Sequence, residues 1–245
     1  MKREFVKTKN ARLFDSKIAS AQQRGANEGG LVIVMGRPGD GKTRTMEAWA
    51  ATTGAIMVTG QVDSTPRKLL MEMAAQLKID VVKGFELVME EMIVKGDISI
   101  IVDEAGFCMD NKALCLEKLR GITDRTKTLL VLVFMERDRA RLADAKVQQL
   151  QSRVYNYCNF QKNSLEDISL SCAQLGEVAM EPALVEHIYK KTDGSMRLAV
   201  NAIRRIELIA AARSPEKSQT PMTLADIQGA ELTPDHGKTS RKTTA

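Results

Sequence analysis

The chain is poor in aromatic side chains and contains no long apolar run. Aromatic residues make up only 4% of its 245 residues, so a core has to be built mainly from Leu, Ile, Val, Ala and the 13 Met. No apolar run reaches the roughly 18 residues that a membrane-spanning helix needs. The amino terminus leads into no apolar segment of the secretory-signal type. The four cysteines lack metal-ligand spacing, which favours reduced thiols. Together these absences predict a cytoplasmic protein with no membrane partner.

The most informative segment is 36–43, which matches G-x-x-x-x-G-K-[ST], the phosphate-binding P-loop. Its glycines let successive backbone N–H groups converge on an anion. We expect Lys42 to reach the β- and γ-phosphates and the Thr43 hydroxyl to ligate Mg²⁺. An apolar strand over 31–35 and a helix from Lys42 supply the context that the motif requires. The residues expected to bind nucleotide are Gly36, Arg37, Pro38, Gly39, Asp40, Gly41, Lys42, Thr43 and Arg44.

A second segment, 98–104, is an apolar strand that ends in two acids. An Asp at the carboxyl end of a strand beside a P-loop can hold Mg²⁺ through water, so Asp103 is a metal candidate together with Thr43. Glu104 is then placed to orient and deprotonate an attacking water. The alternative is a strand end with two solvated acids. With the P-loop upstream, the two segments together indicate a nucleoside triphosphatase.

Two arginines are further candidates for the same chemistry. Arg197 lies in the first turn of a helix, where its charge opposes the helix dipole. Contact with a bound phosphate would explain it, although a surface Arg packed along apolar neighbours is the alternative. Arg153 ends a polar helix and could enter the site of an adjacent subunit, where it would stabilise transition-state charge as a catalytic group together with Lys42 and Glu104.

The order of apolar segments predicts two parts. Strands alternate with helices over the first 160 residues, as in a parallel sheet with right-handed crossovers. After residue 165 only helical periodicity is convincing. We expect a basic arm or helix over 1–30, a P-loop α/β nucleotide-binding domain over 31–160, a helical lid over 161–232 and a disordered tail over 233–245. Expected strands are 31–35, 55–58, 98–102, 128–134 and 155–160, and expected helices are 42–51, 64–77, 84–94, 111–122, 137–152, 165–176, 182–191, 195–212 and 223–229.

Positive charge is concentrated near the amino end. The formal net charge is +5, with a pI near 9.0. Residues 1–24 contain seven Lys or Arg against two acids, so the rest of the chain is near neutral. Residues 238–242 are basic as well. Such arms suit a polyanionic partner, or they are solvated termini that aid solubility.

These motifs together resemble the AAA+ ATPases, over about residues 4–232. Residues 36–43 resemble Walker A and residues 98–104 resemble Walker B. Residues 194–197 are similar to the G-x-x-R of sensor 2. Ser152-Arg153 is similar to the arginine finger of the initiator and clamp-loader branches. The resemblance implies an ATPase that uses ATP and Mg²⁺, with a parallel sheet flanked by helices and then a small all-helical lid.

Within AAA+, the chain is most similar to the transposition ATPases typified by the phage Mu B protein. Residues 5–8, the Gly-x-Pro-Gly-x-Gly-Lys-Thr form of the P-loop, 65–70 and 103–105 carry this resemblance. It implies ATP-dependent filaments of the protein on duplex DNA without strong sequence preference, recruitment or stimulation of a transposase, and the cytoplasm of a bacterial host. The alternatives are a replication initiator or loader-type ATPase, which would form closed rings or small complexes of defined size, and a nucleotide switch that does not hydrolyse ATP.

The chain departs from that family at two places. The Mu B protein has an additional helix-turn-helix domain, whereas about 30 residues precede the first core strand here. Met135 stands about where sensor 1 places a polar residue after the fourth strand. Either Glu136 then positions the water or hydrolysis is slow.

Phosphate-backbone contacts are expected from basic loops and helix ends, because affinity of this kind comes from counterion release rather than from base readout. Aromatic side chains suited to base stacking are absent from the candidate segments. Each candidate is also consistent with a solvated surface. Besides the amino-terminal arm, the candidates are Lys112, Lys118, Arg120, Arg125, Lys127, Arg204 and Arg205.

Overall fold

A computed structural model describes residues 1–23, 30–110, 113–142, 148–213 and 220–233. The chain divides into two compact units. One comprises Lys9–Gln161, and the other combines Met1–Thr8 with Lys162–Ala245. Each unit is described by itself below.

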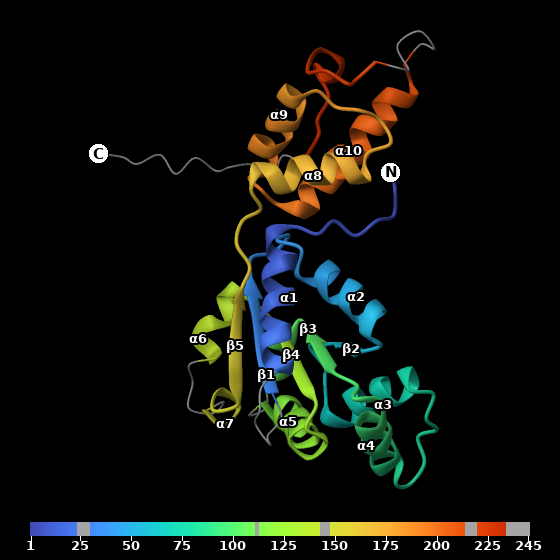
Figure 1. Ribbon diagram of the computed structural model, residues 1–245, viewed down its shortest axis with the longest axis vertical. Helices are drawn as coiled ribbons and strands as arrows, with labels where there is room; N and C mark the ends of the chain where they lie inside the picture. Colours follow the sequence, from blue (N-terminus) through green and yellow to red (C-terminus); the bar gives the residue numbers. More distant parts are fainter. Residues whose placement is uncertain (24–29, 111–112, 143–147, 214–219, 234–245) are drawn as a thin grey trace, which may run out of the picture. The chain divides into compact units, whose positions relative to one another are not determined.

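The unit over 9–161 is built on one five-stranded sheet in the order β2-β3-β4-β1-β5 (Figure 1). All strand pairs are parallel, as the alternation of strands and helices predicts. Its central strands are continuous apolar runs, which is typical of a sheet that is covered on both faces. The strands are β1 (Gly30–Gly36), β2 (Ile56–Thr59), β3 (Ile100–Asp103), β4 (Leu129–Met135) and β5 (Val154–Asn159).

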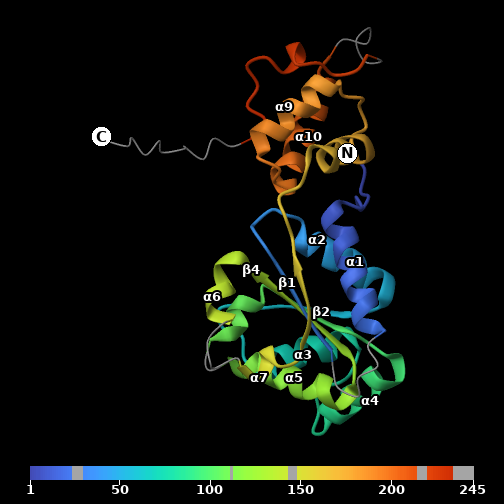
Figure 2. The same cartoon turned by 60° about the vertical axis from the view of Figure 1, so that its left-hand side comes forward.

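Helices cover both faces of this sheet, and alternate residues of each strand point to opposite layers. Leu31 and Ile33 of β1 belong to the apolar cluster on the side of α3, α4 and α5. Val32 and Val34 belong to the cluster on the side of α1 and α2. Figures 1 and 2 show these two helix groups on opposite sides of the strands. The helices are α1 (Lys9–Gln22), α2 (Lys42–Thr53), α3 (Pro66–Gln76), α4 (Phe85–Gly96) and α5 (Leu114–Thr126).

Local capping explains where the helices beside the site begin and end. Helix α2 starts directly after Gly41 and stops at Gly54, which adopts the left-handed conformation and donates its N–H to Ala50 O. Helix α3 begins with Pro66, and the Thr65 hydroxyl accepts a hydrogen bond from Lys68 N. The order Thr-Pro therefore acts as the start signal that the sequence predicts.

The expected basic arm over 1–30 is not one segment in the structure. Residues 1–8 belong to the helical unit, whereas α1 packs on the sheet and contacts β1 and β5. Phe14 and Ile18 of α1 are buried, and the Phe14 ring meets Trp49 edge to face with 5.6 Å between ring centroids. The apolar stripe of α1 thus serves the core, and Arg24 lies outside the described residues.

The expected polar helix over 137–152 differs as well. A short 3₁₀ turn η3 (Glu136–Asp138) leads into α6 (Arg139–Leu142), and α7 (Gln148–Gln151) precedes β5. Residues 143–147 lie outside the described part of the chain. The side chain of Asp138 accepts a hydrogen bond from Met135 N, and this closes a tight turn directly after β4.

The other unit is helical, and its three long helices lie within a residue or two of the predicted ranges. They are α8 (Leu165–Leu175), α9 (Pro182–Thr192) and α10 (Met196–Ala211), followed by the 3₁₀ turn η6 (Ala225–Ile227) where a short helix is expected. Ser164 forms a capping box with Asp167 at the start of α8, and the Ser195 hydroxyl caps α10. Their apolar faces meet in one core that includes Ile188, Ile203 and Ile206. Apart from Thr233, the predicted tail over 233–245 lies outside the described residues.

No helix in the described ranges is long and apolar enough to span a membrane. All four cysteines are buried as free thiols. Burial raises the pKa of the Cys108 and Cys158 thiols to about 12.

Candidate active site

The P-loop follows β1 at the carboxyl edge of the sheet and turns through two left-handed glycines. Gly39 has a φ of 86° and Gly41 a φ of 94°, conformations that other residues adopt only with strain. Gly36 is required for a different reason, since an added Cβ would lie 2.9 Å from Phe160 Cβ. The loop thus has the curled backbone that phosphate binding needs, and α2 begins at Lys42 behind it.

Asp40 holds this turn from inside. Its carboxylate accepts a hydrogen bond from Arg37 N at 2.8 Å, and its side chain is buried. Burial raises the pKa of Asp40, while the Arg37 amide and the charges of Arg37 and Lys42 oppose that shift. Asn10 of α1 supports the loop from behind, because its amide donates to Asp40 O and Gln161 O. No motif in the sequence identifies Asn10 in this role.

Lys42 is buried, and its ammonium group lies inside the loop. Nζ donates to Gly36 O and Arg37 O, both at 2.9 Å, and lies 3.5 Å from the sulfur of Met135. The end of β4 therefore lies directly beside the P-loop lysine. Met135, which the family resemblance places at sensor 1, thus lies next to Lys42.

The acids at the end of β3 face the same loop. Thr43 Oγ1 donates to Asp103 Oδ2 at 2.7 Å, and the other carboxylate oxygen of Asp103 accepts Glu104 N at 2.9 Å. Asp103 is buried, whereas Thr43 is exposed. The predicted pair of Thr43 and Asp103 is thus in contact across 60 residues of sequence.

Glu104 stands apart from this hydrogen-bonded pair. Its backbone is left-handed, with a φ of 49°, which turns the chain sharply after β3. Burial, and next the charge of Asp103, raise its pKa. Among the described residues, none donates a hydrogen bond to its carboxylate. A carboxylate that is half-buried and unpartnered, beside a P-loop, suits a general base.

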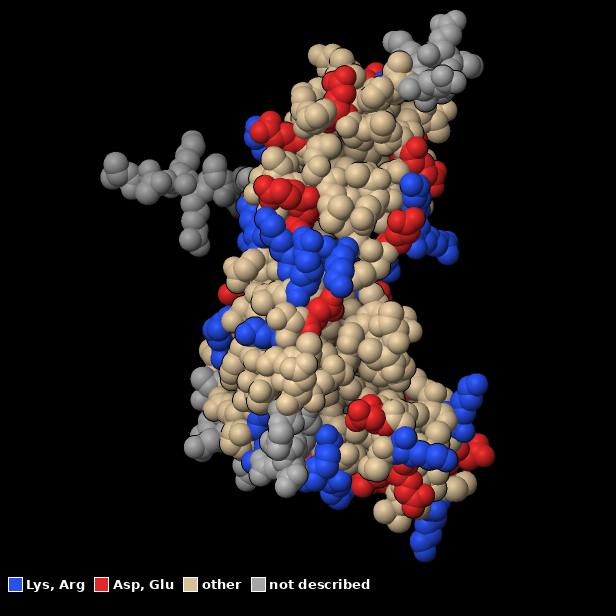
Figure 3. Space-filling model, viewed as in Figure 1, with Lys and Arg blue, Asp and Glu red and all other residues tan. Residues whose placement is uncertain are grey.

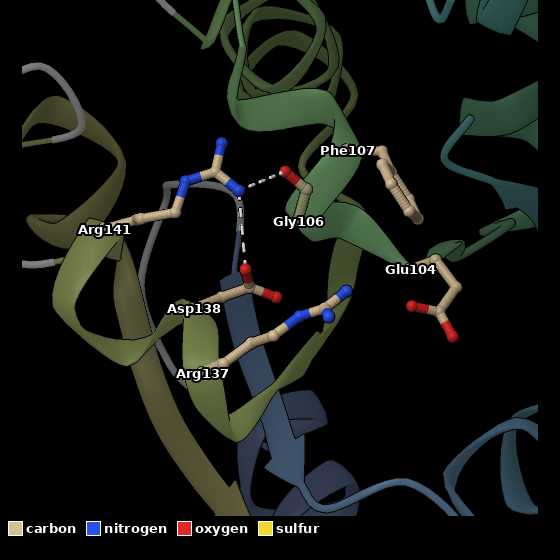
Figure 4. Close-up of a pocket in the computed structure, with 6 residues that line it drawn as sticks. All are labelled: Glu104, Gly106, Phe107, Arg137, Asp138 and Arg141. Carbon is tan, nitrogen blue, oxygen red and sulfur yellow. Dashed lines mark hydrogen bonds and ion pairs between the residues drawn. The ribbon is translucent and has the colours of Figure 1, made fainter. Parts of the chain in front are cut away.

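Glu104 lines a pocket of about 280 Å³ together with residues that the sequence analysis does not identify (Figure 4). Asp138 and Arg141 form one wall, where Arg141 Nη1 donates to Gly106 O at 3.0 Å and approaches Asp138 Oδ1 at 3.4 Å. Arg137 projects from the adjoining turn toward Glu104. The one feature of the sequence that could have identified these pocket residues is the charge of 136–141. That charge is equally typical of the surface of a polar helix.

Arg153 lies at the opposite end of the strands, where their amino termini are. It immediately precedes β5, and its carbonyl accepts Leu31 N at the first residues of β1. Gly36 lies five residues after Leu31 along β1, which is about 16 Å at 3.3 Å per residue. The Arg153 side chain lies 3.5 Å from Asp124 in an ion pair. Arg153 is therefore outside its own P-loop site, as a residue that acts on a neighbouring subunit has to be.

The two remaining candidates are at the surface. Arg44 pairs with Glu47 at 3.3 Å on α2. Arg197 is exposed in the first turn of α10, in the helical unit. The contact of Arg197 with a bound nucleotide stays a prediction.

Most of the basic residues around α5 that are proposed for DNA contact form ion pairs with acidic side chains. Lys118 pairs with Glu86, Arg120 with Glu117 and Asp124, and Arg125 with Glu90, at distances of 2.6–2.8 Å. Lys112 lies outside the described residues, and Lys127 is exposed. In the helical unit Arg204 is exposed and Arg205 donates to Glu231 O. Local ion pairs thus neutralise much of the charge that made the α5 region a candidate.

The helical unit also carries exposed cations. Figure 3 shows Lys and Arg side chains on the surface of both units, among acidic side chains. In the helical unit Lys162 pairs with Asp193 and Lys190 with Glu186, whereas Lys191, at the end of α9, and Arg197, at the start of α10, are exposed without an ion pair among the described residues.

The residues present fit Mg²⁺ in one arrangement. No group of three or more His, Cys, Asp or Glu that could hold a metal occurs in the described ranges. A hydroxyl and a buried carboxylate 2.7 Å apart, Thr43 and Asp103, suit the ion that keeps most of its waters and shares phosphate oxygens with a nucleotide. Together with the glycine cradle and Lys42, this donor set fits a magnesium–nucleotide complex.

The comparison with protein families found one match. Residues 24–142 match the family model described as an AAA domain. A comparison with curated proteins found no match.

Solved structures share the fold over most of the chain. Drosophila ORC bound to DNA aligns with a TM-score of 0.60 at 17% identity, over 90% of this chain and 59% of that one. The Aeropyrum pernix ORC2 protein in ADPNP–ADP complexes gives 0.60 at 16%, over 85% and 64%. Domain III of the Thermotoga maritima replication initiation protein DnaA gives 0.57 at 14%, over 89% and 90%.

This chain therefore spans 59% and 64% of the length of the two ORC chains. At these identities the similarity shows the fold, which is the AAA+ P-loop fold that the motifs predict. The structures just named include replication initiators, and the resemblance to transposition ATPases stays a prediction.

Proposed function

We propose that this chain, built on an AAA+ fold, is an ATPase that works as an oligomer on duplex DNA. The observation that carries the proposal is the contact between the two halves of the site. Thr43 of the P-loop hydrogen-bonds Asp103 of the β3 edge, and Glu104 follows Asp103 without a partner among the described residues. The groups that we propose to bind phosphate and to activate water thus lie next to each other.

Each residue has a distinct part in the proposed hydrolysis. The backbone of the P-loop binds the phosphates, and Lys42 leaves Gly36 O and Arg37 O to bind the β- and γ-phosphates. Glu104 accepts the proton of a water that attacks the γ-phosphorus in line, while the bond to the β-phosphate oxygen breaks. Mg²⁺ bound near Thr43 and Asp103 would neutralise charge on the phosphate oxygens.

Completion of the site by a second copy follows from the place of Arg153. Its own P-loop lies at the other edge of the sheet, about 16 Å away by strand geometry. A neighbouring copy that presents Arg153 to this P-loop would supply the positive charge that the transition state needs. Arg197 of the helical unit is proposed to bind the nucleotide as well.

The proposal of duplex DNA as partner rests on the exposed cations Lys191 and Arg197 of the helical unit and on the similarity to an ORC structure that is bound to DNA. Such contacts would be made with the phosphate backbone, so affinity would fall steeply with salt.

Two finer roles are open to such an ATPase. The solved structures favour a replication initiator or loader-type role, because two ORC proteins and DnaA share the fold. The form of the P-loop and residues 65–70 favour a transposition regulator that recruits a transposase. We place the initiator-type role first, since it is supported by more than sequence motifs.

Electron microscopy of the full chain with ATP, Mg²⁺ and plasmid DNA tests this assignment, together with phosphate release measured with and without DNA. Closed rings or small complexes of defined size support the initiator-type role, whereas continuous filaments along DNA support the transposition role. Binding of ADPNP with no release of phosphate from ATP would support the alternative of a nucleotide switch that does not hydrolyse ATP. A chain that binds no adenine nucleotide in the presence of Mg²⁺ would refute the proposal.

A further inference from the structure

The AAA+ site of this chain lacks a hydrogen-bond donor where β4 ends. Met135 fills that position, and its sulfur lies 3.5 Å from Lys42 Nζ. A thioether accepts hydrogen bonds weakly and donates none, so Met135 cannot bind a phosphoryl oxygen. The adjacent Glu136 is an anion, and its charge would repel a γ-phosphate rather than bind it. Neither side chain can therefore donate a hydrogen bond to the γ-phosphate.

Arg137, the next residue along the chain, has the chemistry that these two lack. Its guanidinium projects into the pocket that Glu104 lines, from the side opposite the β3 edge (Figure 4). The side chain is exposed, and among the described residues no carboxylate lies within ion-pair distance of it. The next two arginines differ, because Arg139 bonds Asn159 and Arg141 bonds Gly106 O and Asp110.

The backbone that carries Arg137 is held firmly against the turn that carries Glu104. Asp138 accepts Met135 N at 3.2 Å, and Arg141 links Asp138 to Gly106 O. The two turns approach so closely that a Cβ on Gly106 would lie 2.4 Å from Asp138 Oδ2. Such an arrangement fixes the pocket before any ligand arrives, which is what a binding group for a transition state requires.

We propose that Arg137 binds the γ-phosphoryl group of ATP within its own subunit and replaces the polar sensor 1 residue that Met135 displaces. This inference rests on the ATPase activity proposed above. A guanidinium donates two parallel N–H groups to phosphoryl oxygens, and it keeps its charge at every accessible pH. Arg137 then stabilises the phosphoryl group as it leaves the β-phosphate oxygen, while Glu104 on the facing wall takes the proton of the attacking water.

The test compares R137A, R137K and the control R139A in the full chain. Binding of ADP and of ADPNP is measured by calorimetry. The rate of phosphate release in the presence of Mg²⁺ gives kcat and KM. The protein concentration is set high enough that turnover per chain no longer increases with concentration. R139A removes the same charge two residues away and leaves the pocket intact. Because ADP has no γ-phosphate, loss of a residue that binds the γ-phosphate must weaken ADPNP binding more than ADP binding.

We expect R137A to leave the Kd for ADP within about twofold, to weaken ADPNP binding about tenfold, and to lower kcat about 10²-fold. R137K keeps the charge without the planar fork and should fall between R137A and the unaltered chain. R139A should stay within about twofold of the unaltered chain. The double variant R137A/M135N should recover part of the lost kcat, because the amide introduced by M135N would supply a donor at the end of β4.

Three results would overturn the inference. Equal weakening of ADP and ADPNP would mean that Arg137 only supports the fold of the site. A rise in kcat for R137A would mean that Arg137 restrains Glu104 instead of binding phosphate. An unchanged kcat would mean that it has no part in the reaction. Failure of the unaltered chain to bind or hydrolyse ATP is a different outcome, which refutes the proposed function itself.

Discussion

The two edges of the parallel sheet have opposite electrostatic organisation. At the carboxyl edge, Lys42, Asp103 and Glu104 converge on one loop, and Glu104 has no partner among the described residues. At the amino edge, charges are paired, because Asp124 binds both Arg120 and Arg153. The carboxyl edge thus keeps Glu104 unpaired and able to meet a ligand, whereas Arg153 at the amino edge is bound by Asp124 of the same chain.

This difference explains why one copy would be an incomplete ATPase. Strands of a parallel sheet all place their carboxyl ends at one edge, so a residue just before β5 is excluded from the P-loop edge of its own subunit. The proposed contact of Arg153 with a γ-phosphate therefore requires another copy. When copies assemble, Arg153 would leave Asp124 and bind the phosphate in the neighbouring copy. ATP turnover would then depend on assembly.

The largest effect is expected when the phosphate-binding edge loses its cation. Lys42→Ala removes the charge that lies inside the P-loop, so binding of ADPNP should become undetectable at micromolar nucleotide and turnover should be lost. Fluorescent-nucleotide titration measures this. Lys68→Ala, which removes an exposed cation paired with Asp63 on the same unit, is the matched control. Retention of tight ADPNP binding by Lys42→Ala would mean that the P-loop assignment is wrong.

Loss of the cation at the amino edge is expected to be next in size. Arg153→Ala should lower kcat about 10³-fold and leave the Kd for ADPNP of the isolated chain unchanged, because the finger acts on another copy. Mixing this variant with Glu104→Gln should restore some activity, since mixed interfaces combine one intact site with one intact finger. A loss of nucleotide affinity in dilute Arg153→Ala would show instead that Arg153 acts within its own subunit.

Replacement of the proposed base should have a smaller effect on rate. Glu104→Gln keeps the shape of the side chain but cannot accept a proton, so kcat should fall about 10²-fold while ADPNP binds normally. The ATP-bound oligomer should therefore persist, which size-exclusion chromatography with ATP can detect. If this variant turns over ATP at the normal rate, another group activates the water.

The smallest effect is expected from releasing Arg153 from its own acid. Asp124→Asn removes the ion pair with Arg153, whose two side chains are 33% and 24% exposed, and also the ion pair between Asp124 and Arg120; pairs of this kind contribute little. The protein concentration that gives half-maximal turnover should fall about threefold, because Arg153 no longer has to leave Asp124. Glu90→Gln, which removes the partner of Arg125 on the same layer, is the control. A decrease in maximal turnover would show that Asp124 positions Arg153 for its function.

Much of the sheet was predictable because its strands are continuous apolar runs bounded by turn residues. The P-loop and the start of α2 at Lys42 follow from the same local pattern. The prediction of one helix over 137–152 was less accurate. Asp138 closes a turn on Met135 N, and this side-chain bond competes with helix formation where charge periodicity alone favoured a helix.

The role of α1 could not be predicted from charge. Its lysines and arginines led to the expectation of a basic arm or helix over 1–30; the helix is present, and Phe14, Ile18 and Ala21 are buried in the core beside the sheet. Burial of an apolar stripe outweighs the preference of its charged face for an extended, solvated state.

The sequence by itself determined the phosphate cradle, since a glycine-rich turn between a strand and a helix depends only on neighbours in the chain. It also determined which residues carry charge and, to within two residues, where the strands begin. Only the tertiary structure decided that Asp103 reaches Thr43, that Glu104 faces Arg137 and that Arg153 is held by Asp124 at the far edge. These relations join residues tens of positions apart, and they are set by the packing of strands and helices rather than by local pattern.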